Sequence, residues 1–240
     1  MLDDIDTIDD ITGHVIVTNH RFAPIFEEWI ETPSGSPCLG GRLVGVGGRY
    51  KKPITIIDDG STTNDHRLGA VCDLLLALDM LDQKSSLNRE DLGGSEDLGG
   101  SSLLVVAADN LLFFSFQEFV DFAREKGTSC IMCHEQPSIE KLQRTGVIVV
   151  DDQMRVLNME EKPQMPKSHW AVPPFYIYLK KDLDLVRHSV ENGCGKDAPG
   201  NLAHYMVEHT VMHAWPMSGG RFDIGSLDTY YEAIEKYGKD

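Results

Sequence analysis

Short apolar runs rich in β-branched residues alternate with helical patterns through most of this chain, and this alternation constrains the fold more than any other feature. The expected strands are short and lie at 14–19, 54–57, 103–108, 128–133, 175–180 and 211–215. The expected helices each have an apolar face and lie at 21–30, 67–81, 116–127 and the C-terminus. Such alternation builds a sheet that helices cover on both faces. We therefore expect an α/β fold with a mixed, mostly parallel sheet.

Two glycine-rich segments interrupt this pattern and are expected to be flexible inserts. The first covers residues 32–50, and the second covers 88–102, which contains the tandem repeat EDLGGSEDLGGS. Residues 146–163 read as two short strands around an Asp-Asp turn, which predicts a hairpin. A length of 240 residues allows one large domain or two small ones, and we expect a single domain over 1–240.

Charge and cysteine content exclude several classes of partner. The net charge of -16 argues against nucleic acid or an anionic membrane, because phosphate-rich surfaces attract basic proteins. A local site with a metal ion can still bind a phosphate ligand. The five cysteines are an odd number in a long chain, and neither a secretory h-region nor a long apolar run is present. A reducing cytoplasm is the expected location, and a homo-oligomer stays open.

A carboxylate ends the run Leu103–Ala108, which reads as fully buried. Asp109 then lies at the carboxyl end of a strand, where sheets of this kind bind ligands. The alternative is that Asp109 caps the next helix, but Ser115 is better placed for that role.

A second carboxylate, Asp223, lies in the loop GGRFDIGS, whose glycines allow close approach of a ligand. Taken alone, it could be an ordinary loop residue. Two such carboxylates suit Mg²⁺, which takes oxygen ligands and often shares them with substrate phosphates. We expect Asp109 and Asp223 to lie close together although more than a hundred residues separate them.

The segment MEEKP places Glu161 and Lys162 beside Pro163 at the end of the expected hairpin. A lysine there could hold a phosphate while the neighbouring acid accepts hydroxyl groups. Such pairs are commonplace on solvated strand ends, so this motif is weak by itself.

Other patterns suggest chemistry that their context opposes. The segment CIMCH (130–134) matches a haem attachment motif, but a strand would point Cys130 and Cys133 to opposite faces. The histidines at 204, 209 and 213 suit zinc only on one continuous helix. The glycine-rich loop at 40–53 lacks the strand and helix that should flank a phosphate loop. We therefore expect neither haem nor zinc, and no phosphate loop at 40–53.

The order of four segments is more distinctive than any one motif. AADN, RTGVIVVDDQMRVLNMEEKP, VPPFYIY and RFDIGSLDTYYEA follow one another as in the sugar-phosphate nucleotidyltransferases. The chain resembles this family from about His14 to Tyr231. The family includes glucose-1-phosphate thymidylyltransferases, uridylyltransferases and phosphocholine cytidylyltransferases. The resemblance implies a Rossmann-like mixed sheet and an enzyme that transfers a nucleoside monophosphate from an NTP to a sugar 1-phosphate or phosphocholine, releasing pyrophosphate.

The resemblance also implies roles for individual residues. Asp109 and Asp223 would bind Mg²⁺ and are the predicted catalytic acids, together with Lys162. Glu161 and Lys162 would hold the phosphorylated acceptor in a pocket lined by Gly146 and Tyr176. The segment NDHRLGA resembles the family's base-contacting stretch, so the expected nucleotide-binding residues are Asn64, Arg67, Gly69 and Asp109. Ala108 stands where the family usually has glycine, and a small residue should still fit.

The chain departs from the family at its start. The family opens with a strand, a GxGTRL phosphate loop and a Lys-Pro motif, whereas MLDDIDTIDDITGHVIVTN resembles the end of the first long helix and the second strand. The resemblance therefore predicts a sheet whose first strand is missing, in a fragment, a chain with a misassigned start, or a degenerate homologue. An active nucleotidyltransferase and a non-catalytic homologue that binds only the acceptor or a partner chain both stay open.

Overall fold

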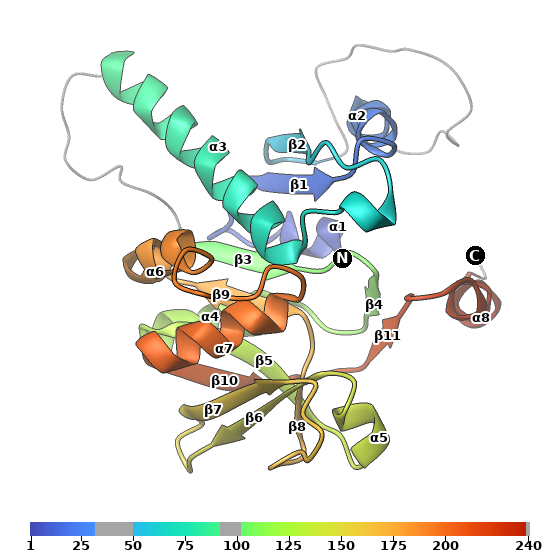
Figure 1. Cartoon of the computed structure of the whole chain (residues 1–240). Coiled ribbons are helices and arrows are strands. Elements are labelled where there is room, and N and C mark those ends of the chain that lie inside the picture. Colours follow the sequence, from blue (N-terminus) through green and yellow to red (C-terminus); the bar gives the residue numbers. More distant parts are fainter. Residues whose placement is uncertain (32–49, 92–101, 239–240) are drawn as a thin grey trace. The chain divides into compact units, whose positions relative to one another are not determined.

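The computed structural model describes residues 1–31, 50–91 and 102–238 of the chain (Figure 1). The two expected inserts therefore lie mostly outside the described residues. The exception is residues 88–91, which are helical because α3 (Ala70–Asp91) continues well past its expected end at 81. The helix thus extends past its expected end, and the two inserts stay predictions. Residues 82–91 contain no glycine or proline, so nothing in them stops a helix.

The described residues divide into two compact units, each built from separate stretches of the chain. Unit 1 comprises Met1–Ile8, Ser102–Leu183 and Ala203–Asp240. Unit 2 comprises Asp9–Ser101 and Asp184–Leu202. The single domain over 1–240 stays a prediction, and each unit is described by itself.

Unit 2 is built on a pair of parallel strands. β1 (His14–Thr18) pairs with β2 (Ile54–Asp58), with His14 opposite Ile54. α2 (Ala23–Glu31) packs on β2, and α3 packs on β1. The short 3-10 turn η1 (Asn64–His66) precedes α3. The strands and helices predicted for this part of the chain are thus confirmed, with helix starts a few residues later than expected.

Unit 1 contains most of the described strands (Figure 1). In chain order they are β3 (Leu103–Val106), β4 (Asn110–Leu112), β5 (Ser129–Glu135), β6 (Gly146–Val150), β7 (Val156–Glu161), β8 (Trp170–Val172), β9 (Phe175–Tyr178), β10 (Met212–Pro216) and β11 (Arg221–Asp223). Seven of them form one sheet in the order β3-β9-β5-β8-β6-β7, with β10 added on β5. β4 and β11 form a separate two-stranded ribbon. The helices of this unit are α1 (Leu2–Ile5), α4 (Gln117–Lys126), α5 (Ile139–Leu142), η2 (Lys180–Asp182), most of α7 (Pro199–His209) and α8 (Leu227–Tyr237). Apart from its first residue, α6 (Leu183–His188) belongs to unit 2.

The sheet is mixed, as expected, but it contains fewer parallel pairs than the sequence predicts. Among the described strands, only β1–β2 and β5–β10 pair in parallel. All other pairs are antiparallel, including the predicted hairpin of β6 and β7. The small number of parallel pairs has a simple reason. Alternating strand and helix patterns show that elements exist, but strands joined by short connections, such as β6 and β7, must run antiparallel.

β5 is the centre of the unit 1 core. Five successive residues from Ser129 to Cys133 are buried, so both faces of this strand are covered. α4 packs on β5 and β10, where the rings of Phe119 and Trp215 lie 5.7 Å apart. Gly127 ends α4 with a φ of 61°, as its position in the sequence predicts. The side chain of Ser115 accepts a hydrogen bond from Gln117 N at the start of this helix.

β3 is less buried than its apolar sequence suggests. All four of its residues are half-buried, and among the described strands it pairs only with β9. The expectation of a fully buried strand is therefore wrong for the described part of the chain. A strand that is paired along one edge leaves part of its side-chain and backbone surface accessible.

Candidate active site

The predicted acidic residues Asp109 and Asp223 come together on the β4–β11 ribbon of unit 1. Asp223 lies directly opposite Asn110 in the antiparallel register, and Asp109 immediately precedes Asn110 in the chain. The backbone N–H of Ile224 donates to the carbonyl oxygen of Asp109 at 2.7 Å, which ties the two segments together. Both carboxylates are exposed. Two accessible acids therefore lie at adjacent positions of the pairing between these segments.

An arginine and a buried amide connect these two acids. Arg221 Nη1 donates to Asn110 Oδ1 at 2.6 Å, and Asn110 Nδ2 donates to Asp109 Oδ1 at 2.8 Å. Arg221 Nη1 also lies 3.7 Å from Asp223 Oδ2. Burial lowers the pKa of Arg221, while the charges of Asp223 and Asp109 raise it. One cation thus interacts with both carboxylates.

The predicted acceptor residues Gly146 and Glu161 are also neighbours. Gly146, the first residue of β6, pairs with Glu161 in β7 and with Val172 in β8. A Cβ atom at Gly146 would lie 3.3 Å from Glu161 Oε2 and 2.5 Å from Met159 Cε. Burial raises the pKa of Glu161, and the nearby charge of Lys162 partly offsets this shift. The missing side chain at 146 therefore leaves room for a carboxylate held in a partly dry environment.

Lys162 and Tyr176 complete this group. Lys162 has a φ of 49°, a left-handed conformation that a lysine seldom adopts, and its backbone N–H donates to Thr145 O at 3.1 Å. Its Nζ atom lies 3.9 Å from Glu161 Oε1, and its side chain is 59% exposed. Tyr176 is buried in β9, and burial together with the charge of Glu161 raises its pKa. The structure therefore gathers Gly146, Glu161, Lys162 and Tyr176 at one place in unit 1.

Apart from Asp109, the predicted nucleotide-binding residues lie in unit 2. Asn64 begins η1, and Arg67 Nη2 forms an exposed ion pair with Asp197 Oδ1 at 2.8 Å. Gly69 has a φ of 93°, and a Cβ atom there would lie 2.4 Å from Lys196 O. The structure therefore gives Gly69 a packing role, whereas base contacts by Asn64, Arg67 and Gly69 stay a prediction.

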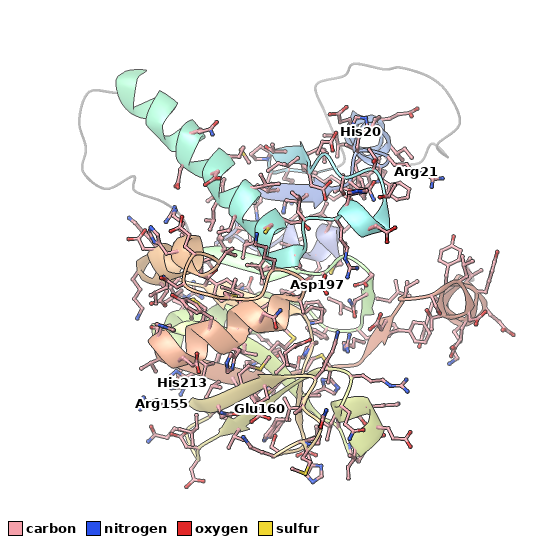
Figure 2. The ribbon with its side chains drawn as sticks, viewed as in Figure 1. His20, Arg21, Arg155, Glu160, Asp197 and His213 are labelled. Atoms are coloured by element: carbon pink, nitrogen blue, oxygen red, sulfur yellow. The ribbon has the colours of Figure 1, made fainter. Side chains whose placement is uncertain are left out.

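The CIMCH segment and the three histidines at 204, 209 and 213 lie on different elements of the fold. Cys130 and Cys133 are buried, and burial raises the pKa of each thiol to about 12. His204 and His209 lie on α7, whereas His213 lies on β10 and forms a backbone bridge with Arg155 (Figure 2). In the described part of the chain, no three His, Cys, Asp or Glu side chains form a group suited to a metal. Residues 40–49 of the candidate phosphate loop lie outside the described residues.

Sequence reasoning missed Asn110 and Arg221. Asn110 is 4% exposed, and its amide bridges Arg221 and Asp109. Arg221 could have been found, because residues two apart on a strand share one face and Asp223 was already a candidate. Asn110 could not have been found from the sequence, since its role depends on the register of β4 with β11.

The acids on the β4–β11 ribbon fit a hard divalent cation of the Mg²⁺ class. Asp109 and Asp223 supply oxygen donors, and both are accessible. Asn110 holds Asp109 Oδ1, which leaves Oδ2 of that carboxylate for a ligand. A pair of carboxylates suits an ion that keeps waters or substrate oxygens as its other ligands.

None of the described helices is long and apolar enough to cross a membrane.

Comparisons with known proteins agree with these features. The family model "Nucleotidyl transferase" matches residues 74–240. The chain is 27% identical over 133 residues to a glucose-1-phosphate adenylyltransferase from Fervidobacterium nodosum, covering 54% of this chain and 32% of that protein. It is 26% identical over 133 residues to the enzyme of the same name from Mycoplasma mobile, covering 54% of this chain and 35% of that protein. The matched regions thus span about a third of these curated relatives.

Solved structures support the fold. A UDP-glucose pyrophosphorylase solved in complex with UDP-glucose aligns with a TM-score of 0.67 at 16% identity, covering 94% of this chain and 81% of that one. The apo structure of a UDP-glucose pyrophosphorylase aligns equally well. The predicted Rossmann-like mixed α/β fold is therefore confirmed.

Proposed function

This chain belongs to the nucleotidyl transferase family, and we propose that it transfers a nucleoside monophosphate from an NTP to a sugar 1-phosphate. The products would be pyrophosphate and an NDP-sugar. The observation that carries the proposal is the β4–β11 ribbon, where Asp223 lies opposite Asn110, the residue after Asp109, and where Arg221 interacts with both acids. The names of the relatives support the substrate class, since they act on glucose 1-phosphate or bind UDP-glucose.

The acceptor would bind at Glu161 and Lys162. Lys162 presents an exposed ammonium group that can hold the acceptor phosphate. Glu161 can accept hydrogen bonds from sugar hydroxyls, and its partly dry surroundings strengthen such bonds. The left-handed φ of Lys162 supports a functional role, because strained backbone is retained where the surrounding structure fixes it for a purpose.

The reaction needs no covalent intermediate. A phosphate oxygen of the acceptor attacks the α-phosphorus of the NTP, and the bond from the α-phosphorus to the β-phosphate bridging oxygen breaks as pyrophosphate leaves. Lys162 would orient the attacking phosphate, and Arg221 would add positive charge near the acids. Mg²⁺, held by Asp109 and Asp223, would offset the charge that builds on the phosphoryl oxygens. Positioning of the two substrates would supply much of the remaining rate enhancement.

The nucleotide base would be contacted by the segment NDHRLGA. Asn64, Arg67 and Gly69 are proposed for this role on the family resemblance of NDHRLGA. We further propose a cytoplasmic location. The described cysteines Cys72, Cys130, Cys133 and Cys194 are free thiols, which suits a reducing compartment.

The test is pyrophosphate release from each of the four common NTPs, with Mg²⁺ and either glucose 1-phosphate or phosphocholine as acceptor. Asp109→Asn and Asp223→Asn should each lower kcat by about 100-fold or more, because each removes charge next to the transferred group. Lys162→Met should mainly raise the KM for the acceptor. Arg144→Met, which removes an exposed cation two residues before Gly146, is the matched control and should change neither constant.

The outcomes separate the candidate functions. If pyrophosphate is released with phosphocholine but not with glucose 1-phosphate, the acceptor is phosphocholine and not a sugar 1-phosphate. Calorimetric binding of an acceptor that depends on Lys162, without any release of pyrophosphate, would favour the non-catalytic homologue. Activity that survives both aspartate substitutions would refute the proposed site.

A further inference from the structure

Arg221 occupies an unusual place for a cation. It lies on the same face of β11 as Asp223, two residues away, and its side chain is only 19% exposed. Asp223 and Asp109 are the two carboxylates assigned to a divalent cation above. A metal site built from two acids thus already contains a positive group of the protein.

The contacts of Arg221 reach both acids by different routes. Its Nη1 atom lies 3.7 Å from Asp223 Oδ2. The same atom donates to Asn110 Oδ1, and Asn110 in turn donates to Asp109 Oδ1. Asn110 is buried, so this relay is fixed by packing. The guanidinium therefore holds both carboxylates in their positions.

A buried histidine lies near this group but adds no positive charge. Burial and the charge of Arg221 lower the pKa of His134, on β5, which favours its neutral form. Its Nδ1 atom is buried without a hydrogen-bond partner in the described part of the chain. An arginine stays protonated throughout the accessible pH range. The net charge of the two acids and Arg221 is therefore about -1 instead of -2, which weakens the attraction for a dication.

We propose that Arg221 is a resident counter-ion of the Asp109–Asp223 pair, which orders the two carboxylates and weakens their binding of a free divalent cation. The inference rests on the proposed function, because it assumes that these acids form the metal site. Its consequence is that the cation would bind well only together with the nucleotide triphosphate. The added phosphate oxygens supply ligands and give the guanidinium a second anionic partner.

The experiment uses Mn²⁺ as the probe and measures free Mn²⁺ by electron paramagnetic resonance, without nucleotide. Arg221→Gln should bind Mn²⁺ about tenfold more tightly than the unsubstituted protein, since removing a nearby positive charge restores the full attraction. Arg221→Lys keeps the charge and should stay within about threefold of the unsubstituted protein. Arg155→Gln removes an equal charge at the turn before β7 and should leave the affinity unchanged.

Two further measurements keep failures of the inference and of the proposed function apart. Adding Asp109→Asn or Asp223→Asn to Arg221→Gln should abolish the gained affinity. If Arg221→Gln binds Mn²⁺ no more tightly than the unsubstituted protein, while Asp109→Asn and Asp223→Asn each weaken Mn²⁺ binding, the counter-ion role is overturned and the metal site stands. If Mn²⁺ binding does not depend on either acid, the metal site of the proposed function is overturned. Circular dichroism checks folding, and Arg221→Met, an uncharged side chain of similar length, replaces Arg221→Gln should that variant unfold.

Discussion

At the scale of single residues, Glu161 is a carboxylate whose surroundings disfavour its charge. Burial raises its pKa, and Lys162 at 3.9 Å lowers it only in part. A group in this condition reduces the stability of the folded protein whenever it is ionised. This unfavourable ionisation occurs next to Lys162, which has a left-handed backbone conformation. Both features fit a site that is complete only when a ligand supplies the missing partners.

The pH dependence of stability should reveal this penalty. At a pH below its ordinary pKa, Glu161 is protonated in both the folded and the unfolded protein and costs nothing. As the pH rises toward the raised pKa, the unfolded chain loses its proton first, so the free energy of unfolding falls. Glu161→Gln should therefore gain stability relative to the unsubstituted protein across this window. Urea unfolding at several pH values measures the difference, and a difference that does not change with pH would contradict the prediction.

Gly146 allows a second prediction at the same scale. In Gly146→Ala, the new methyl group would meet Met159 Cε at 2.5 Å and Glu161 Oε2 at 3.3 Å, and Met159 is buried. Overpacking of this kind should cost about 1–3 kcal/mol of unfolding free energy and raise the KM for the acceptor. Met159→Leu shortens the obstructing side chain, so the double variant should recover part of the lost stability. No rescue in urea unfolding would show that the clash lies elsewhere.

At the scale of elements, a buried polar network joins β5 to the segments around η2 and α7. Ser129 donates to Asp182 Oδ2 at 2.6 Å and accepts from Leu179 N at 3.0 Å. Thr210 donates to the other carboxylate oxygen of Asp182 at 3.0 Å. Ser129 and Asp182 are both buried. This network satisfies the polar groups where the central strand begins, and it helps to hold β5 beside β9 and β10.

Ser129→Ala should therefore be strongly destabilising. It leaves Leu179 N and one oxygen of a buried carboxylate without their partner, which should cost about 2–4 kcal/mol. The control is Ser226→Ala, which removes the exposed capping box of α8 and should cost about 1 kcal/mol. Equilibrium unfolding in urea compares the two variants, and equal losses would show that the network contributes little beyond an ordinary hydrogen bond.

At the scale of the whole molecule, the two units differ in how their strands are supported. β5 is buried along five successive residues and is paired along both edges, with β10 on one and with β8 and β9 on the other. β1 and β2 are mostly half-buried, and in the described part of the chain they pair only with each other. Sheets of two strands depend on neighbouring packing for their stability. Local opening should therefore begin in unit 2.

Hydrogen exchange followed by mass spectrometry tests this difference. Amides of β5 should exchange at least about 100-fold more slowly than those of β1 and β2, because strands buried at the core open only with global unfolding. Peptides from the half-buried strand β7, at the edge of the unit 1 sheet, provide an intermediate reference. Equal protection in β1 and β5 would show that the two units unfold as one cooperative body.

Local sequence patterns were enough to predict the kind of elements, their approximate positions and the identity of the candidate acids. Hydrophobic periodicity is local, so strands such as β5 and stop signals such as Gly127 are readable from a few neighbouring residues. The ordered motifs around Asp109, Glu161 and Asp223 pointed to the family that the comparisons confirm.

The tertiary structure decided what depends on pairing between distant segments. Strand direction and the register of β4 with β11 arise from hydrogen bonds between residues more than a hundred positions apart. That register makes Asn110 the link between Asp109 and Arg221, and places Arg221 between two acids. Gly146 and Glu161 pair within the predicted hairpin, but only the fold around that hairpin buries Glu161 enough to raise its pKa. Burial and charge at a site are properties of the folded surroundings, so a linear pattern can name the residues but not their electrostatic state.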